Sequence, residues 1–154
     1  MTPAEPNTRG RRVPNWDLDS IRDLRILRKK RIVDEVEFFE APAFTRHVAR
    51  YLSDDEFAGL QRFLAANPEA GDLMPGTGGF RKLRWGDERR GKGRRGGLRI
   101  IYYFLIADEQ MWLFTLFGKN EAADLTPVEK RQLRAAIEAE LRARDAARKK
   151  KRRG

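Results

Sequence analysis

The sequence contains no cysteine and a single histidine, His47, among its 154 residues. Without cysteine, the chain can form no disulfide bond, no thiolate zinc site and no cysteine nucleophile. A single histidine also excludes an acid–base mechanism that needs two. The position of His47 beside Arg46 in a predicted helix favours a structural or surface role. Any catalysis must therefore use lysine, arginine or tyrosine side chains.

Long hydrophobic runs and clustered metal ligands are missing as well. No segment approaches the roughly 18 uninterrupted apolar residues of a membrane span, and residues 1–8 carry no apolar core of a signal peptide. We therefore expect a cytoplasmic protein that does not engage a membrane. The acidic residues 54–56 follow Ser53 at the start of a predicted helix and belong to its cap. We accordingly expect no metal site and no small-molecule cofactor.

Positive charge is the dominant feature of the composition. Lysine and arginine number 33 against 23 aspartate and glutamate residues, which gives a net charge of +10 and an isoelectric point near 10.4. An excess of this size indicates a polyanionic partner. Nucleic acid is the usual one, with an acidic protein or an anionic membrane surface as less common alternatives.

The hydrophobic pattern predicts one domain of the α+β class. β-branched and aromatic residues predict a strand over residues 32–39, and later strands over 80–85, 98–106 and 111–117. Two helices are expected between the first and second strands, and a last helix follows Thr126. The predicted order, β-α-α-β-β-β-α, implies a mainly antiparallel sheet packed by helices.

Changes in composition divide the chain into three segments. Residues 1–30 are rich in arginine and proline, and we expect them to form a partly disordered N-terminal extension. The folded domain is predicted over residues 31–143. Residues 144–154 include an unbroken basic run from Arg148 to Arg153, so we expect a disordered and solvated tail there.

Basic residues are concentrated between positions 81 and 99, with only two acidic residues among them. They are Arg81, Lys82, Arg84, Arg89, Arg90, Lys92, Arg94, Arg95 and Arg99. Because neighbouring antiparallel strands bring their side chains together, these groups can form one patch that fits a phosphate backbone. The glycines of the intervening loop would let it approach a polynucleotide closely. The alternative is a solvated basic loop that only aids solubility.

Aromatic residues in the predicted strands can either stack on RNA bases or belong to the core. The core is the expected place for most of them, and this holds equally for Tyr102, Tyr103, Trp112 and Phe117. Because successive side chains of a strand point to opposite faces, only one of Tyr102 and Tyr103 can face a ligand. We take Tyr103 as the candidate RNA-binding tyrosine.

Basic side chains alone can support the cleavage of RNA. The ribose 2′-OH attacks the adjacent phosphodiester, while arginine and lysine orient the phosphate and stabilise its charge without a metal ion. A lysine whose pKa is lowered by neighbouring cations can also act as the base. DNA has no 2′-OH and would resist this reaction.

Four motifs occur in the order found in a known toxin superfamily. They are Glu69-Ala-Gly-Asp72, Gly78-Gly-Phe-Arg-Lys-Leu-Arg-Trp85, Gly96-Gly-Leu-Arg-Ile-Ile-Tyr-Tyr103, and Leu113-Phe-Thr-Leu-Phe-Gly-Lys119 followed by Glu121 and Asp124-Leu-Thr. On these motifs the chain closely resembles the HigB branch of the RelE/ParE toxins, over about residues 33–141. The resemblance implies a fold like that of the microbial ribonucleases and ribosome-dependent cleavage of mRNA. It also implies a HigA-like helix-turn-helix antitoxin as partner.

The resemblance further implies which residues act on RNA. The family's binding and cleaving positions correspond to Lys82, Arg84, Arg99 and Lys119. We expect Arg99 to clamp the phosphate in the transition state, Lys82 or Arg84 to act as base or phosphate orienter, and Lys119 to add a cationic contact. RelE also has a stacking tyrosine near its C-terminus, for which the sequence after Lys119 has no counterpart.

Two other functions fit the same sequence features. A ParE-like gyrase inhibitor shares the fold but lacks the cationic catalytic set, so the basic residues named above argue against it. A non-catalytic nucleic-acid-binding module would use the loop and the tail only electrostatically.

Overall fold

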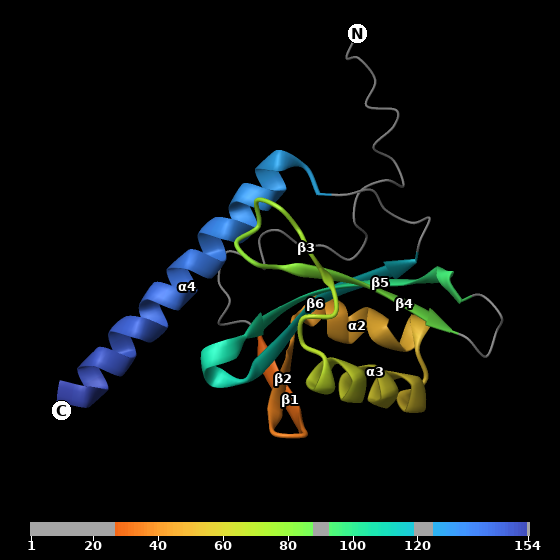
Figure 1. Ribbon diagram of the computed structural model, residues 1–154, viewed down its shortest axis with the longest axis horizontal. Coiled ribbons are helices and arrows are strands. Elements are labelled where there is room, and N and C mark those ends of the chain that lie inside the picture. Colours follow the sequence, from red (N-terminus) through yellow and green to blue (C-terminus); the bar gives the residue numbers. More distant parts are fainter. Residues whose placement is uncertain (1–26, 88–92, 119–124, 154) are drawn as a thin grey trace, which may run out of the picture.

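The computed structural model of the chain describes residues 27–87, 93–118 and 125–153, with side chains except at residues 87, 93–96 and 153. Its elements are β1 Arg28–Val33, β2 Val36–Glu40, α2 Pro42–Tyr51, α3 Asp54–Ala66, β3 Asp72–Leu73, β4 Arg81–Asp87, β5 Gly93–Leu105, β6 Gln110–Gly118 and α4 Pro127–Arg153. They form an α+β fold around one six-stranded sheet of order β1-β2-β6-β5-β4-β3 (Figure 1). The predicted fold class is confirmed.

The first part of the sheet is a hairpin, where the sequence predicts one strand. β1 and β2 pair in antiparallel fashion and are joined by Asp34 and Glu35, both of which have positive φ (48° and 70°). A two-residue turn with positive φ at both residues matches the twist of the strands that it joins. Sequences usually signal this turn by asparagine or glycine, and neither is present here. β1 begins at Arg28, so the folded domain starts before the predicted residue 31. Residues 1–26 of the predicted extension lie outside the described residues.

The centre of the sheet is the predicted hairpin of β5 and β6. The two strands pair over most of their length, and β6 is buried from Met111 to Phe117. β2 lies parallel to β6 on one side, while β4 lies antiparallel to β5 on the other. The two-residue strand β3, which the sequence analysis does not predict, completes the edge beside β4. This arrangement places β4 and β5, which carry the basic residues, side by side.

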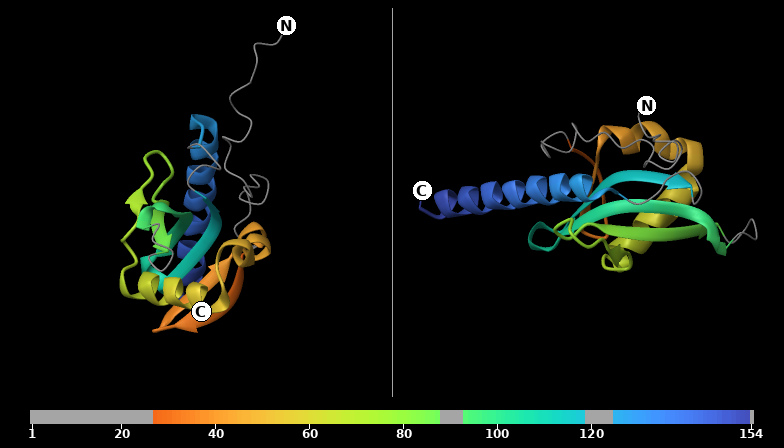
Figure 2. Two further views of the ribbon diagram at one scale, coloured as in Figure 1. Left: turned by 90° about the vertical axis from the view of Figure 1, so that its right-hand side faces the viewer. Right: turned by 90° about the horizontal axis from the view of Figure 1, so that it is seen from above.

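Helices cover both faces of the sheet and produce two separate hydrophobic clusters. On one face α2 and α3 pack against β4, β5 and β6, with Phe44, Leu60 and Leu64 fully buried against Leu83 and Ile100. α3 begins with the predicted capping box of Ser53 and Glu56. Figure 2 shows α4 on the other face. There a second cluster joins the inward-facing residues of α4 to the sheet: Leu133, Ile137, Phe80, Ile101 and Trp112.

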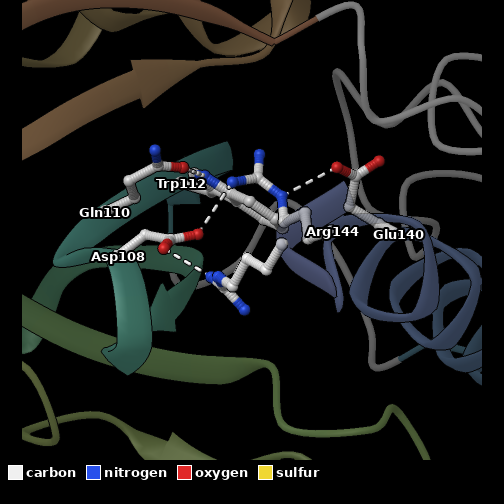
Figure 3. A network of polar contacts seen from close by, with 6 residues as sticks. Asp108, Gln110, Trp112, Glu140 and Arg144 are labelled. Atoms are coloured by element: carbon white, nitrogen blue, oxygen red, sulfur yellow. Dashed lines mark hydrogen bonds and ion pairs between the residues drawn. The ribbon is translucent and has the colours of Figure 1, made fainter. Parts of the chain in front are cut away.

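The last helix is much longer than predicted. α4 begins with the predicted capping box of Thr126 and Glu129 and continues to Arg153, so the expected disordered tail of residues 144–154 is wrong over nearly all its length. The helix is held in its C-terminal half by Asp108, which accepts hydrogen bonds from Arg144 and Arg148 (Figure 3). Alanines within the segment also favour the helical state.

None of the helices in the described segments is both long enough and apolar enough to cross a membrane.

Candidate nucleic-acid interface

The register of β4 and β5 brings three of the predicted catalytic residues to one face of the sheet. Arg84 lies directly opposite Arg99, and Lys82 lies opposite Ile101. Residues directly opposite each other in an antiparallel pair share a face, and so do residues two apart in one strand. Lys82, Arg84 and Arg99 therefore lie on the α4 face, because Ile101 belongs to the cluster beneath α4.

Of the three cations, Arg84 and Arg99 lie nearer than Lys82 to the ends of β4 and β5 that flank residues 88–92. Figure 1 and the right-hand view of Figure 2 show that α4 leads away from these ends. Arg84 is exposed, while Lys82 and Arg99 are half-buried. Phe117 of β6 lies directly opposite Arg99 on the other side of β5 and is buried in the cluster beneath α4. What this face exposes is therefore cationic, which suits a phosphate group.

The direct pairing of Arg84 with Arg99 opposes folding. Like charges opposite each other in a sheet destabilise it, typically by a few tenths of a kcal/mol to about 1 kcal/mol. Burial, followed by the charge of Arg84, lowers the pKa of Arg99 below its ordinary value. An arginine nevertheless keeps its charge in a protein, so the repulsion persists at neutral pH. A bound anion between the two guanidinium groups would remove it.

Among the contacts of the described residues, the guanidinium group of Arg99 keeps N–H donors for such an anion. Its Nη1 lies 3.5 Å from the carbonyl oxygen of Gly97 and 3.4 Å from that of Leu98, both long for hydrogen bonds. A guanidinium group carries five N–H donors in a planar fork that matches two oxygens of a phosphate. The geometry of Arg99 therefore fits the predicted phosphate clamp.

Gly97 fixes the approach of the two strands at this point. A Cβ built on Gly97 would lie 2.0 Å from the carbonyl oxygen of Trp85 and 2.7 Å from the Cα of Gly86. The pairing of β4 and β5 is irregular just there, between Trp85 and Asp87. We expected this glycine to serve close contact with a polynucleotide, and the structure shows that the packing of β4 on β5 also requires it. Close backbone contact at Gly97 sets the register that pairs Arg84 with Arg99.

Lys82 stands in a different electrostatic setting from the two arginines. Asp72 of β3 lies directly opposite it on the outer side of β4. Opposite charges placed in this way stabilise a sheet. Asp72 is part of the Glu69–Asp72 motif, but its position beside Lys82 follows only from the pairing of β3 with β4. Lys82 is thus the outer member of the set, next to a carboxylate.

Arg81 does not join the other cations. It alternates with Lys82 along β4 and lies opposite Tyr102, on the face covered by α2 and α3. Its Nη1 donates hydrogen bonds to the carbonyl oxygens of Glu69, at 3.1 Å, and Gly71, at 2.8 Å. This guanidinium group therefore holds the loop before β3, which differs from the predicted RNA contact.

Tyr103 is packed among aromatic residues. Its ring stacks on Trp112 with centroids 5.5 Å apart and meets Phe80 at 5.2 Å in a tilted arrangement. Burial raises its pKa above the ordinary tyrosine value. Trp112 in turn lies under the guanidinium of Arg144, 5.1 Å from the ring centroid. Because one face of Tyr103 is covered by Trp112, only its half-exposed edge is available for a ligand.

The remaining predicted RNA-binding residues, and the predicted catalytic residue Lys119, cannot be placed beside this face. Arg89, Arg90, Lys92 and Lys119 lie outside the described residues. The backbone of Arg94 and Arg95 belongs to β5, but their side chains are likewise not described.

His47 and the acidic residues show no sign of a catalytic cluster. Burial, then the charges of Arg50 and Arg46, lower the pKa of His47, and α2 lies on the face opposite the cations. Within residues 27–87, 93–118 and 125–153, no three histidine or acidic side chains gather as metal ligands would.

No model of a known protein family matches this chain.

Proposed function

We propose that the chain is the toxin of a type II toxin–antitoxin system, a ribosome-dependent endoribonuclease of the HigB/RelE kind that cleaves mRNA without a metal ion. The pairing of Arg84 with Arg99 on an accessible sheet face carries the proposal. Two facing guanidinium groups weaken the sheet unless an anion lies between them, and residues held at a cost to stability are typical of functional sites.

The proposed reaction is an in-line displacement at one phosphodiester of the mRNA. The 2′-oxygen forms a new bond to phosphorus as the bond to the 5′-oxygen breaks, leaving a 2′,3′-cyclic phosphate and a 5′-hydroxyl end. The 2′-OH passes its proton to a solvent water molecule and the departing 5′-oxygen takes a proton from solvent, so the step consumes no other reactant. Arg99 and Arg84 bind the non-bridging oxygens, whose negative charge grows in the transition state. Lys82 and Lys119 add cationic contacts to the same strand.

The ribosome supplies what this face lacks. Three cations and the edge of one tyrosine hold a phosphate but do little to align the 2′-OH for attack. A ribosome-bound codon already has a fixed backbone, so part of the orientation is provided before the toxin binds. The resemblance to the HigB branch supports this dependence, and it also supports a HigA-like helix-turn-helix antitoxin and action in the cytoplasm.

Mapping of mRNA ends in cells tests the proposal. The chain is expressed from a tightly repressed promoter, and 5′ ends of cellular mRNA are mapped within minutes, with and without a block of translation. We expect new ends inside coding frames that disappear when translation is blocked. Growth arrest with intact mRNA would contradict the proposal and favour a gyrase inhibitor, while neither arrest nor cleavage would favour a nucleic-acid-binding module.

A further inference from the structure

The C-terminal part of α4, residues 142–153, carries charge without an apolar face. We call this segment the basic arm. It contains eight lysine and arginine residues and one acid, Asp145, and its other three residues are alanine. The helix continues past the sheet in the view from above (Figure 2). The proposed catalytic set of β4 and β5 does not include any residue of the arm.

Two cations of the arm anchor it, and four others, all among the described side chains, are exposed. Arg144 and Arg148 donate hydrogen bonds to Asp108, and Arg144 also pairs with Glu140 (Figure 3). Lys149 lies 3.6 Å from Asp145, with both side chains largely exposed. Arg142, Lys150, Lys151 and Arg152 are exposed and form no ion pair with another residue that the structure describes.

The arm remains helical although, apart from the stacking of Arg144 on Trp112, its described residues add nothing to the hydrophobic clusters. The pairs of Glu140 with Arg144 and of Asp145 with Lys149 are four residues apart, the spacing at which side chains meet on a helix. Cations in the last turn also interact favourably with the helix dipole. Because successive residues point about 100° apart, the cations at 149–152 surround the helix on nearly every side.

The residue types of the arm indicate which class of partner it can bind. Stable protein interfaces depend on aromatic or aliphatic anchors, and lysine is depleted in them. A helix that lies on a membrane needs an apolar face. Residues 142–153 contain neither aromatic or aliphatic anchors nor an apolar helix face. A helix with cations on nearly every side is best matched by the closely spaced phosphates of a nucleic acid.

We propose that the basic arm is a second RNA-binding surface, which holds the phosphate backbone of ribosomal RNA while the β4–β5 face acts on mRNA. The choice of ribosomal RNA rests on the proposed function. The anchoring of Arg144 and Arg148 by Asp108 fixes the direction of the arm relative to the sheet. A fixed direction lets contact at the arm orient the β4–β5 face on the ribosome.

Salt-dependent binding to purified ribosomes tests the arm. The variant replaces Lys150, Lys151 and Arg152 by glutamine, and the control replaces the exposed Arg46, Arg50 and Arg62 of α2 and α3 by glutamine, so both lose three charges. All chains also carry Arg99→Gln, which removes mRNA cleavage from the measurement. Far-UV circular dichroism checks the helix, which glutamine supports.

We expect the arm variant to bind ribosomes about tenfold or more weakly, and the slope of log K against log salt to fall by about 2 to 3. The control should change little, and lysine-to-arginine replacements at 150 and 151 should retain binding. Equal losses in variant and control, or no loss in either, would overturn the inference. So would an arm effect seen with duplex DNA but absent with ribosomes. An intact arm effect, combined with failure of the chain with unchanged Arg99 to cut mRNA in cells, would instead count against the proposed ribonuclease and not against the arm.

Discussion

At the scale of single residues, the paired arginines of β4 and β5 lower the stability of the free protein while providing two cations for a phosphate. Arg84 lies directly opposite Arg99 and is the more exposed of the two. Their repulsion acts in the free protein, and it becomes an attraction shared by both residues when a phosphate binds. Removing one of the two charges should therefore affect stability and activity in opposite directions.

Arg84→Gln should stabilise the free protein slightly and weaken RNA cleavage. Relief of the like-charge pair is expected to raise the free energy of unfolding by up to about 1 kcal/mol. Urea unfolding at low and high salt measures this, and added salt should reduce the difference because it screens exposed charges. A loss of stability in Arg84→Gln would show that the pair is not repulsive.

Gly97→Ala should destabilise the protein by more than about 2 kcal/mol, because its Cβ would overlap the Trp85 carbonyl oxygen and force the two strands apart. Gly59→Ala is the matched control. Gly59 lies in α3, where a Cβ meets only the Arg62 side chain at 3.9 Å, so alanine there should add about 0.5–1 kcal/mol. Thermal unfolding of the two variants would contradict this account if they moved in the same direction.

At the scale of elements, α4 depends on Asp108 for its attachment beyond Leu141. Asp108 follows β5 in the short 3-10 turn Ile106–Asp108 and accepts hydrogen bonds from Arg144 and Arg148. Burial acts to raise the pKa of Asp108, but the hydrogen bonds and charges of the two arginines outweigh it and lower the pKa. The ionised carboxylate is therefore the form that holds the helix.

Asp108→Asn should cost about 1–2 kcal/mol of stability at neutral pH, since two charge-assisted hydrogen bonds are lost from a partly exposed site. Because the folded pKa of Asp108 is lowered, its contribution is complete above the ordinary aspartate pKa and disappears as the pH falls through the folded value. The two proteins should therefore converge in acid.

Urea unfolding across this range measures the convergence, with Asp145→Asn as control. Asp145 forms only an exposed pair with Lys149, so its replacement should change stability by less than about 0.5 kcal/mol. A gap between wild type and Asp108→Asn that stayed constant into acid would contradict the assigned role.

The sequence predicts the elements with strong local patterns and misses those decided by distant contacts. The capping boxes at Ser53 and Thr126 and the β5–β6 hairpin follow directly from residue type and spacing. The Asp34–Glu35 turn carries no glycine, and the helical state of residues 144–153 depends on Asp108, some 36 residues earlier in the chain.

The candidate site also has features that local sequence patterns predict and others that only tertiary contacts decide. Alternation along β4 predicts that Lys82 and Arg84 share a face, but which residue of β5 lies opposite them depends on register. The close contact at Gly97 and the irregular pairing beside it fix that register. The local hydrogen bonds of Arg81 and the stacking of Tyr103 on Trp112 depend on the tertiary structure, and composition gives no indication of them.

At the scale of the whole molecule, the positive charge has a definite distribution. One group of cations lies on β4 and β5, and the other surrounds the end of α4 on the far side of the β5–β6 turn (Figure 1). α2 and α3 cover the opposite sheet face. The molecule therefore presents its two basic regions from separate elements of one fold, which suits contact with two strands of RNA at once.

Cleavage of mRNA on purified translating ribosomes tests the central claim most directly. Single-turnover rates are compared for wild type, Arg99→Gln and the control Arg46→Gln, after unfolding experiments show that all three are folded. We predict translation-dependent cuts that leave 5′-hydroxyl ends, a rate roughly 10²–10³-fold lower for Arg99→Gln, and an unchanged rate for the control. Cleavage by Arg99→Gln at the wild-type rate would contradict the assignment of this face as the site of RNA cleavage.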